Sequence, residues 1–213
     1  GEEGIWNKYD PRLFELDYFL HQPQQSWKLI KEIFFDSYQE CGPNPAHEAL
    51  ARLEEEGVVK AIITQNIDAL HQRAGSKNIA EFHGTISSLK CISCLTVVER
   101  DDIVLGDELP RCPACETVLK PNFIFFGEPI PEDAMQMSLR ETAQSDVMII
   151  IGSTGEVMPA SGLPAAAKQE GSTIIEVNIN ETRFTGQITD IFLQGKASQV
   201  MSRLADEVLR LRG

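Results

Sequence analysis

Two pairs of cysteines constrain this chain more than any other feature of its sequence. Two residues separate Cys91 from Cys94, two separate Cys112 from Cys115, and seventeen lie between the pairs. This spacing is typical of a zinc site with four cysteine ligands, in which a loop brings two tight turns together. Four thiolates leave no coordination position open, so we predict one structural Zn(2+) per chain. Two redox-active pairs are the alternative interpretation.

Hydrophobic runs predict the strands of a parallel sheet. Apolar stretches rich in β-branched residues span residues 58–63, 146–151 and 173–179. The segments between them carry helical features, such as a start at Asn44 with proline at the first helical position and an end at Gly57. Strands that alternate with helices predict an α/β protein with a Rossmann-like, doubly wound parallel sheet.

A smaller domain should accompany this sheet. Residues 11–40 are rich in aromatic and apolar residues, and they predict two helices or one broken helix. Residues 86–119, around the cysteines, show little apolar periodicity, so zinc binding would supply their missing folding free energy. We expect residues 41–85 and 120–213 to form a Rossmann-like domain. Residues 1–40 and 86–119 should form a small zinc-binding and helical domain.

The charge balance argues against some partners. Acidic residues outnumber basic ones by 32 to 19, which gives a net charge of −13 at pH 7, and no Lys/Arg cluster interrupts it. Direct nucleic-acid binding needs a positive face, so we expect none. No apolar run approaches the roughly eighteen residues of a membrane span, and no signal-peptide pattern opens the chain. We therefore expect a cytoplasmic protein without membrane association.

Polar side chains follow the first predicted strand. Gln65, Asn66 and Asp68 come directly after it, and open α/β sheets bind ligands outside the carboxyl ends of their strands. His83 follows in a Phe-His-Gly context, where it could act as a general base near neutral pH. An ordinary Asx-capped turn and a packed or capping histidine are the alternatives. The spacing alone does not decide between them.

Taken in order, the motifs resemble those of the sirtuin family of NAD-dependent protein deacylases. The chain carries Thr-Gln-Asn-Ile-Asp at 64–68, Leu-His at 70–71, Ala-Gly at 74–75, His-Gly at 83–84, the two cysteine pairs and Phe-Gly-Glu at 126–128. The resemblance covers essentially the whole chain. It implies removal of an acyl group from a protein lysine with NAD as co-substrate, which releases nicotinamide and O-acyl-ADP-ribose.

The resemblance also implies a role for individual residues. His83 would be the general base that deprotonates a ribose hydroxyl, and Asn66 would orient a water. The cofactor-binding positions would be Gln65, Asn66, Asp68, Gly152, Ser153, Thr154, Asn178 and Ala197. The positions that bind the acyl-lysine peptide, partly by strand pairing, would be Ile124, Phe126, Gly127, Glu128 and Val157. Residues 123–126 also predict a core strand.

The chain departs from the family pattern at two places. Gly155 stands where many members have leucine, which would loosen the pocket wall. Residues 1–6 resemble a family stretch that normally follows a first strand and a Gly-Ala-Gly-x-Ser loop, so we expect that strand and loop to be missing and dinucleotide affinity to fall. Protein mono-ADP-ribosyl transfer is one alternative function. A truncated, catalytically weak zinc-stapled module that binds acyl-lysine peptides is another.

Overall fold

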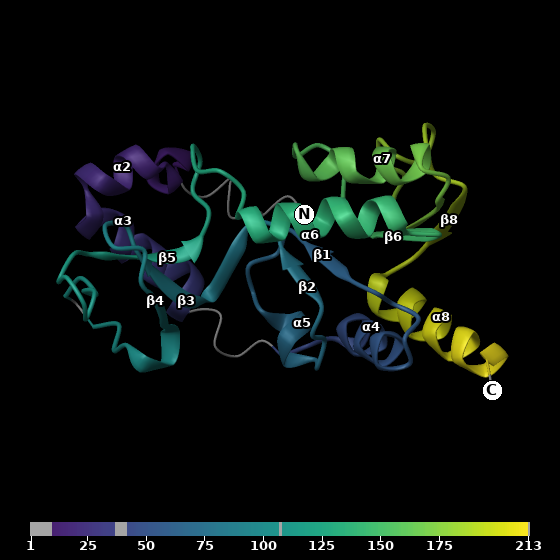
Figure 1. The fold of residues 1–213 in the computed structure, drawn as a ribbon, viewed down its shortest axis with the longest axis horizontal. Helices are drawn as coiled ribbons and strands as arrows, with labels where there is room; N and C mark the ends of the chain where they lie inside the picture. Colours follow the sequence, from purple (N-terminus) through teal and green to yellow (C-terminus); the bar gives the residue numbers. More distant parts are fainter. Residues whose placement is uncertain (1–9, 37–41, 107, 213) are drawn as a thin grey trace. The chain divides into compact units, whose positions relative to one another are not determined.

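The computed structural model describes residues 10–36, 42–106 and 108–212, which fall into two compact units (Figure 1). Unit 1 joins the N-terminal segment to Asn66–Ala69 and His83–Pro131. Unit 2 comprises Gly42–Gln65, Leu70–Phe82 and the chain from Glu132 onward. Packing therefore groups residues 120–131 with the N-terminal helices and the cysteines, whereas the sequence-based domains placed them with the parallel sheet. Residues 1–6, which bear on the expected missing strand, lie outside the described residues.

Unit 1 combines short helical elements with one antiparallel sheet. In that sheet, β3 (Gly84–Cys91) lies between β4 (Val97–Glu99) and β5 (Leu119–Phe123). The helical elements are η1 (Pro11–Phe14), α2 (Leu16–His21), α3 (Pro23–Ile30), the π-helical η2 (Lys31–Asp36) and η3 (Arg100–Asp102). The predicted break between the N-terminal helices is confirmed, because α3 begins with a proline that has no N–H to donate.

Aromatic side chains form the core of unit 1. Phe19 and Phe125 pack edge to face with ring centroids 5.4 Å apart, and Trp27 Nε1 donates to the carbonyl of Leu119 at 2.8 Å. The prediction of a strand at 123–126 was wrong in its position, since β5 ends at Phe123. Beyond it the chain leaves the sheet, and Phe126 forms a parallel bridge with Glu15.

Unit 2 has the predicted α/β organisation. Its strands are β1 (Ile62–Thr64) parallel to β2 (Ile79–Glu81), and β6 (Val147–Ile151), β7 (Thr173–Asn178) and β8 (Ile191–Gln194), also parallel. Its helices are α4 (Pro45–Glu55), α5 (Leu70–Arg73), α6 (Glu132–Gln144), η4 (Ala160–Gly162), α7 (Leu163–Gln169) and α8 (Ala197–Arg212). None of the helices in the described ranges is long and apolar enough to cross a membrane.

Helices cover both faces of the β6–β8 sheet. Val177 lies in one core cluster with residues of α4 and α8, whereas Ile174 lies in another with Ala167 of α7 (Figure 1). Successive residues of a strand point to opposite faces, so a strand buried on both sides has apolar residues throughout. This arrangement is the doubly wound fold class expected from the apolar runs.

The sheet of unit 2 differs from the prediction in two details. Val58 and Val59 donate their N–H groups to the carbonyl of Leu53 at 2.8 and 3.1 Å, so they close α4 and the strand begins only at Ile62. Among the described strands, none joins β1 to β6, and the parallel strands form a two-stranded and a three-stranded sheet. Both sheets share one core, because Ile62 and Val177 belong to the same apolar cluster.

Candidate functional site

The four cysteines lie together in unit 1. Their Sγ atoms are all within 4.8 Å of one another. The Cys91–Cys115 and Cys94–Cys115 separations are 3.5 Å, and the Cys94–Cys112 separation is 3.6 Å. A tetrahedral zinc ion with Zn–S bonds of about 2.3 Å requires sulfur atoms about 3.8 Å apart. The donor set therefore fits one zinc ion, as its spacing predicted.

Each cysteine pair occupies the same type of backbone turn. The residue after the second cysteine has a positive φ, 63° at Leu95 and 60° at Glu116. In each turn the residue with positive φ donates its N–H to the carbonyl of the first cysteine. The N–H of that first cysteine donates to the carbonyl of a threonine. These bonds are Leu95 to Cys91 (3.2 Å), Cys91 to Thr96 (2.8 Å), Glu116 to Cys112 (2.8 Å) and Cys112 to Thr117 (2.8 Å).

Both threonines also act on the metal-binding thiols. Thr96 Oγ1 lies 3.1 Å from Cys94 Sγ, and Thr117 Oγ1 lies 3.4 Å from Cys115 Sγ. These hydroxyls lower the pKa of both thiols, that of Cys94 to about 6. A lower pKa favours the thiolate, which is the form that binds zinc. The sequence analysis missed both threonines, although the repeated Cys-x-x-Cys-x-Thr pattern carries them.

Close backbone contact holds His83 in place. The residue is half-buried, and its carbonyl accepts the N–H of Ile124 at 2.9 Å. The next residue, Gly84, has a φ of 73°, and a Cβ atom there would lie 2.2 Å from the carbonyl oxygen of Asn122. Only glycine permits this approach of β3 to β5. The main chain of His83 is therefore held beside Ile124, at the start of the segment 124–128.

The polar motif after β1 is divided between the units. Gln65 belongs to unit 2, whereas Asn66–Ala69 belongs to unit 1. The carbonyl of Ile67 accepts the N–H of Ile86 at 2.9 Å, which ties this segment to β3. Asn66 is exposed and Asp68 is half-buried. The structure thus places Asn66 and Asp68 in the same unit as His83.

A buried ion pair shapes the segment predicted to bind the peptide. Glu128 Oε2 lies 2.9 Å from Lys120 Nζ and accepts the N–H of Phe125 at 2.7 Å. The Lys120 side chain is only 5% exposed, and its Nζ also donates to the carbonyl of Phe123 at 2.6 Å. Burial lowers the pKa of Lys120, and the Glu128 carboxylate opposes that shift. The Glu128 side chain therefore turns inward, while Phe126 and Gly127 remain exposed.

Lys120 was not among the predicted site residues. It is a lone cation in the strand Leu119–Phe123, whose other residues are mostly apolar and buried. A lysine in such a position needs an anion, because an unpaired buried charge is costly. Glu116 is closer to Lys120 in the sequence than Glu128 is, so the pattern could have marked Lys120 but not its partner.

The predicted cofactor residues from Gly152 onward follow the ends of β6, β7 and β8. Asn178 Nδ2 donates to the carbonyl of Ser153 at 3.2 Å, and the Asn178 carbonyl accepts the N–H of Gly195 at 2.9 Å. Gly152 has a φ of 66°, and its missing side chain leaves open space. Ala197 begins α8, and Thr154 is exposed. Small residues and accessible backbone at the carboxyl edge of parallel strands fit a dinucleotide.

Phe184 fills the space beside Gly155. Gly155 is buried with a φ of 78°, and a Cβ atom there would lie 2.9 Å from two ring carbons of Phe184. The expectation that glycine loosens this wall is therefore corrected, because the ring packs against the backbone. Val157, a little further along, is 53% exposed.

A buried carboxylate holds the loop that carries Phe184. Glu176 on β7 is fully buried and accepts three threonine hydroxyl groups, from Thr182 at 2.5 Å and from Thr185 and Thr189 at 2.8 Å. Each bond joins β7 to the loop between β7 and β8. A buried charge with three donors is well satisfied, so this loop has a defined shape.

Together these features define a class of protein: a nucleotide-binding α/β protein with a four-cysteine zinc module. A family model described as "SIR2: Sir2 family" matches residues 1–159. The NAD-dependent protein deacylases of Pyrococcus abyssi and Pyrococcus furiosus are 39% and 40% identical to this chain, and each match covers 99% of this chain and 86% of the relative. The chain belongs to the Sir2 family.

Solved structures give the same result. A "Sir2 homolog-NAD complex" has a TM-score of 0.91 at 38% identity, with 99% of this chain and 82% of that chain covered. A "Sir2 bound to acetylated peptide" has a TM-score of 0.85 at 35% identity, with 94% and 85% covered. The fold class inferred from the sequence is thus confirmed.

Proposed function

We propose that this chain is an NAD-dependent protein lysine deacylase, which produces nicotinamide, O-acyl-ADP-ribose and the free lysine. The observation that carries the proposal is the pinned position of His83, in one unit with Asn66, Asp68 and the segment at 124–128. The relatives named NAD-dependent protein deacylase and the Sir2 structures with NAD and acetylated peptide support it.

His83 acts as the general base in this proposal. Bound NAD would supply an electrophilic ribose carbon, and the His83 imidazole would accept the proton of a ribose hydroxyl. Asn66, with its exposed amide, orients a water, and Asp68 orients the nicotinamide amide. Gln65, Gly152, Ser153, Thr154, Asn178 and Ala197 bind the rest of the cofactor. Much of the rate should come from holding the reacting atoms together, since the site contributes no strong nucleophile.

The peptide binds by strand pairing at Gly127. The backbone N–H and C=O of Phe126 already bond Phe14 and Leu16, at 2.9 and 3.2 Å. These two groups are therefore not available to an added strand. The peptide uses the next residue, Gly127, which is exposed in a turn with a φ of 93°, while Ile124 and Val157 contact the acyl-lysine. Glu128 contributes indirectly, through its ion pair with Lys120.

The metal and the compartment follow from the same cysteines. Zinc bound by Cys91, Cys94, Cys112 and Cys115 holds the module together and takes no part in the reaction, because all its ligands are thiolates. We also propose a cytoplasmic location, since a reducing compartment keeps four adjacent thiols from forming disulfides.

A product assay tests the proposed function. We expect incubation with NAD and an acetyl-lysine peptide to yield O-acetyl-ADP-ribose by mass spectrometry. ADP-ribosylated protein without that product would favour mono-ADP-ribosyl transfer. Calorimetric titration of NAD and of the peptide, each alone, covers the remaining alternative. Peptide binding without NAD binding would identify a zinc-stapled binding module instead.

The variant that removes the proposed base gives the most direct test of the mechanism. His83→Ala should lower kcat at least about a hundredfold, because a positioned general base contributes roughly 10²–10⁴ in rate. Its zinc content should equal that of the parent protein. His21→Ala, which removes an exposed imidazole on α2, is the matched control and should leave kcat unchanged. Full turnover by His83→Ala would remove this residue from the mechanism.

A further inference from the structure

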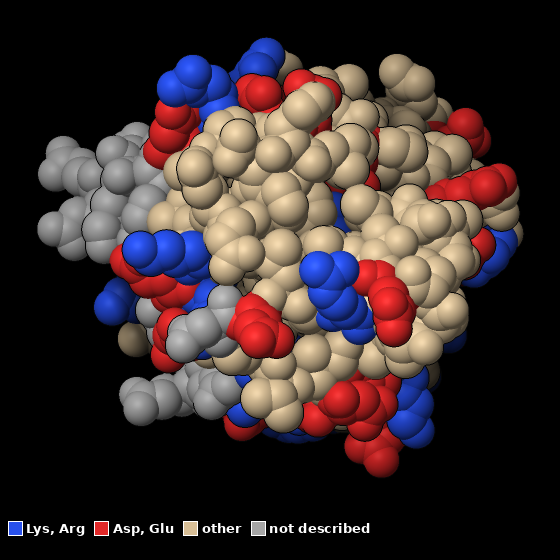
Figure 2. Space-filling model, turned by 90° about the vertical axis from the view of Figure 1, so that its left-hand side faces the viewer, with Lys and Arg blue, Asp and Glu red and all other residues tan. Residues whose placement is uncertain are grey.

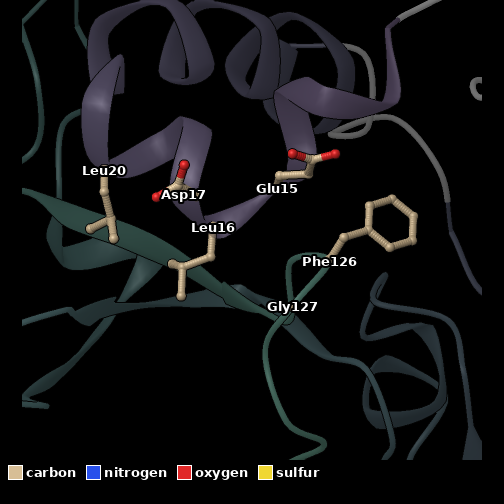
Figure 3. Close-up of a pocket in the computed structure, with 6 residues that line it drawn as sticks. All are labelled: Glu15, Leu16, Asp17, Leu20, Phe126 and Gly127. Atoms are coloured by element: carbon tan, nitrogen blue, oxygen red, sulfur yellow. The ribbon is translucent and has the colours of Figure 1, made fainter.

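An open pocket in unit 1 lies beside the proposed peptide-binding segment. Its volume is about 510 Å³, and it is lined by Glu15, Leu16, Asp17, Leu20, Phe126 and Gly127 (Figure 3). Leu16 and Leu20 project from the same side of α2, as residues four apart on a helix do. The parallel bridge between Glu15 and Phe126 fixes the two walls relative to each other.

The pocket combines exposed apolar surface with two carboxylates. Leu20 is 49% exposed and Phe126 is 57% exposed. The Asp17 side chain is 87% exposed, and Glu15 is exposed too. Binding to such a surface is favourable when the ligand covers the apolar part and leaves the carboxylates hydrated.

Arg12, a basic residue close to the pocket in the sequence, is already bonded to another carboxylate. Arg12 bonds the carboxylate of Asp10 at 2.6 Å, and His21 Nδ1 lies 3.6 Å from Asp17 Oδ1. Figure 2 looks onto the side where α2 and α3 lie and shows acidic and basic residues interspersed around a broad uncharged area. The visible face of unit 1 is therefore not uniformly acidic.

We propose that this pocket binds a lysine or arginine side chain of the substrate peptide, close in sequence to the acyl-lysine. These side chains have an aliphatic stem, which would lie on Leu16 and Leu20, and a cationic head, which would face Glu15 and Asp17. The ring of Phe126 adds a cation–π contact. The inference rests on the proposed function, in which Gly127 pairs with the peptide, and it names a preferred substrate class.

The test compares labelled acetyl-lysine peptides with lysine, arginine or glutamine at single positions within three residues of the acetyl-lysine. Fluorescence anisotropy gives their Kd, and turnover gives kcat and KM. We expect a basic residue at one or more positions to bind about three- to tenfold tighter than glutamine. In Glu15→Gln/Asp17→Asn this preference should disappear, while kcat for the glutamine peptide stays unchanged.

A matched control separates the pocket from the charge of the whole protein. Glu55→Gln/Glu170→Gln changes the net charge equally at two exposed positions of unit 2, and it should keep the preference. No preference in the parent protein, or one that survives in Glu15→Gln/Asp17→Asn, would overturn the inference. Binding measures the pocket and turnover measures the reaction, so peptides that bind with a basic preference but do not react would contradict only the proposed function.

Discussion

Lys120 shows how one residue outside the proposed catalytic set can fix the shape of a binding segment. Its Nζ lies 2.9 Å from Glu128 Oε2, and the same carboxylate oxygen accepts the N–H of Phe125. The ring of Phe125 lies 4.4 Å from the cation. A buried pair of this kind contributes little net stability, but loss of one partner strands the other charge. The pair therefore fixes the conformation of residues 125–128.

Substitution of Lys120 should lower the stability of the fold, and a second substitution at its partner should restore part of that stability. Lys120→Met leaves the half-buried Glu128 without its cation, and we expect the free energy of unfolding to fall by about 2 kcal/mol. The KM for the peptide should rise with it. Lys120→Met/Glu128→Gln leaves no unpaired charge and should recover part of the stability. Urea denaturation and peptide kinetics measure both effects; a single variant as stable as the parent would contradict the argument.

Among the elements, the loop between β7 and β8 is well held although it has no regular secondary structure. Glu176 holds it through three hydroxyl groups, and Phe184 at its centre packs against Gly155 in the loop after β6. Asn178, at the end of β7, bonds the carbonyl of Ser153 in the same β6 loop. Two loops at the carboxyl edge of the sheet thus support each other.

A comparison of two glycines tests this contact. Gly155→Ala introduces both backbone strain and a clash with Phe184, whereas Gly171→Ala introduces only strain, since its φ is 97° and nothing lies within 4 Å. We expect Gly171→Ala to cost about 1 kcal/mol and Gly155→Ala clearly more. Gly155→Ala/Phe184→Ala should destabilise less than the sum of its parts. Chemical denaturation measures the free energy of unfolding of each variant. Equal losses of stability for the two glycine variants would show that the Phe184 ring moves aside without cost.

At the scale of the whole molecule, zinc supports a larger region than its own turns. Cys91 ends β3 and is fully buried, and it belongs to the aromatic core cluster together with Cys112 and Leu119. β3 also begins directly after His83. A bound zinc ion would therefore stabilise the strand that directly follows the proposed base.

Metal removal should affect the two units differently. Chelation of zinc, or Cys112→Ser, should increase amide hydrogen exchange in β3 and β5 and abolish deacylation, because the thiolates then repel one another. The amides of β6–β8 should keep their protection. Acidification should act in the same direction, since protons compete with zinc for the thiolates. Uniform loss of protection in both units would contradict this division.

Local sequence patterns predicted most of the elements but misjudged where some of them begin and end. The apolar run at 58–63 starts four residues before its strand, because Val58 and Val59 satisfy a carbonyl of the preceding helix. The predicted strand at 123–126 overlaps β5 only at Phe123, because Phe125 packs on Phe19 and Phe126 pairs with Glu15. Both deviations depend on partners that periodicity does not reveal.

The candidate site shows the same limit. Spacing alone predicted the four cysteines, and resemblance supplied His83 and the polar residues after β1. Lys120 and the two threonines of the cysteine turns have signatures in the sequence that could have been recognised. The pocket formed by Glu15, Asp17 and Phe126 has none, because more than a hundred residues separate its walls along the chain.

The contact at Gly84 fixes the main chain next to the proposed base relative to the segment proposed to bind the peptide. Where β3 pairs with β5 at Gly84, backbone contacts backbone, so no side-chain rearrangement can separate the two strands. Mutations of the proposed NAD-binding positions in unit 2 should therefore leave the main chain at His83 fixed beside Ile124. Cofactor affinity at those positions can then evolve, or be engineered, without a change in this contact.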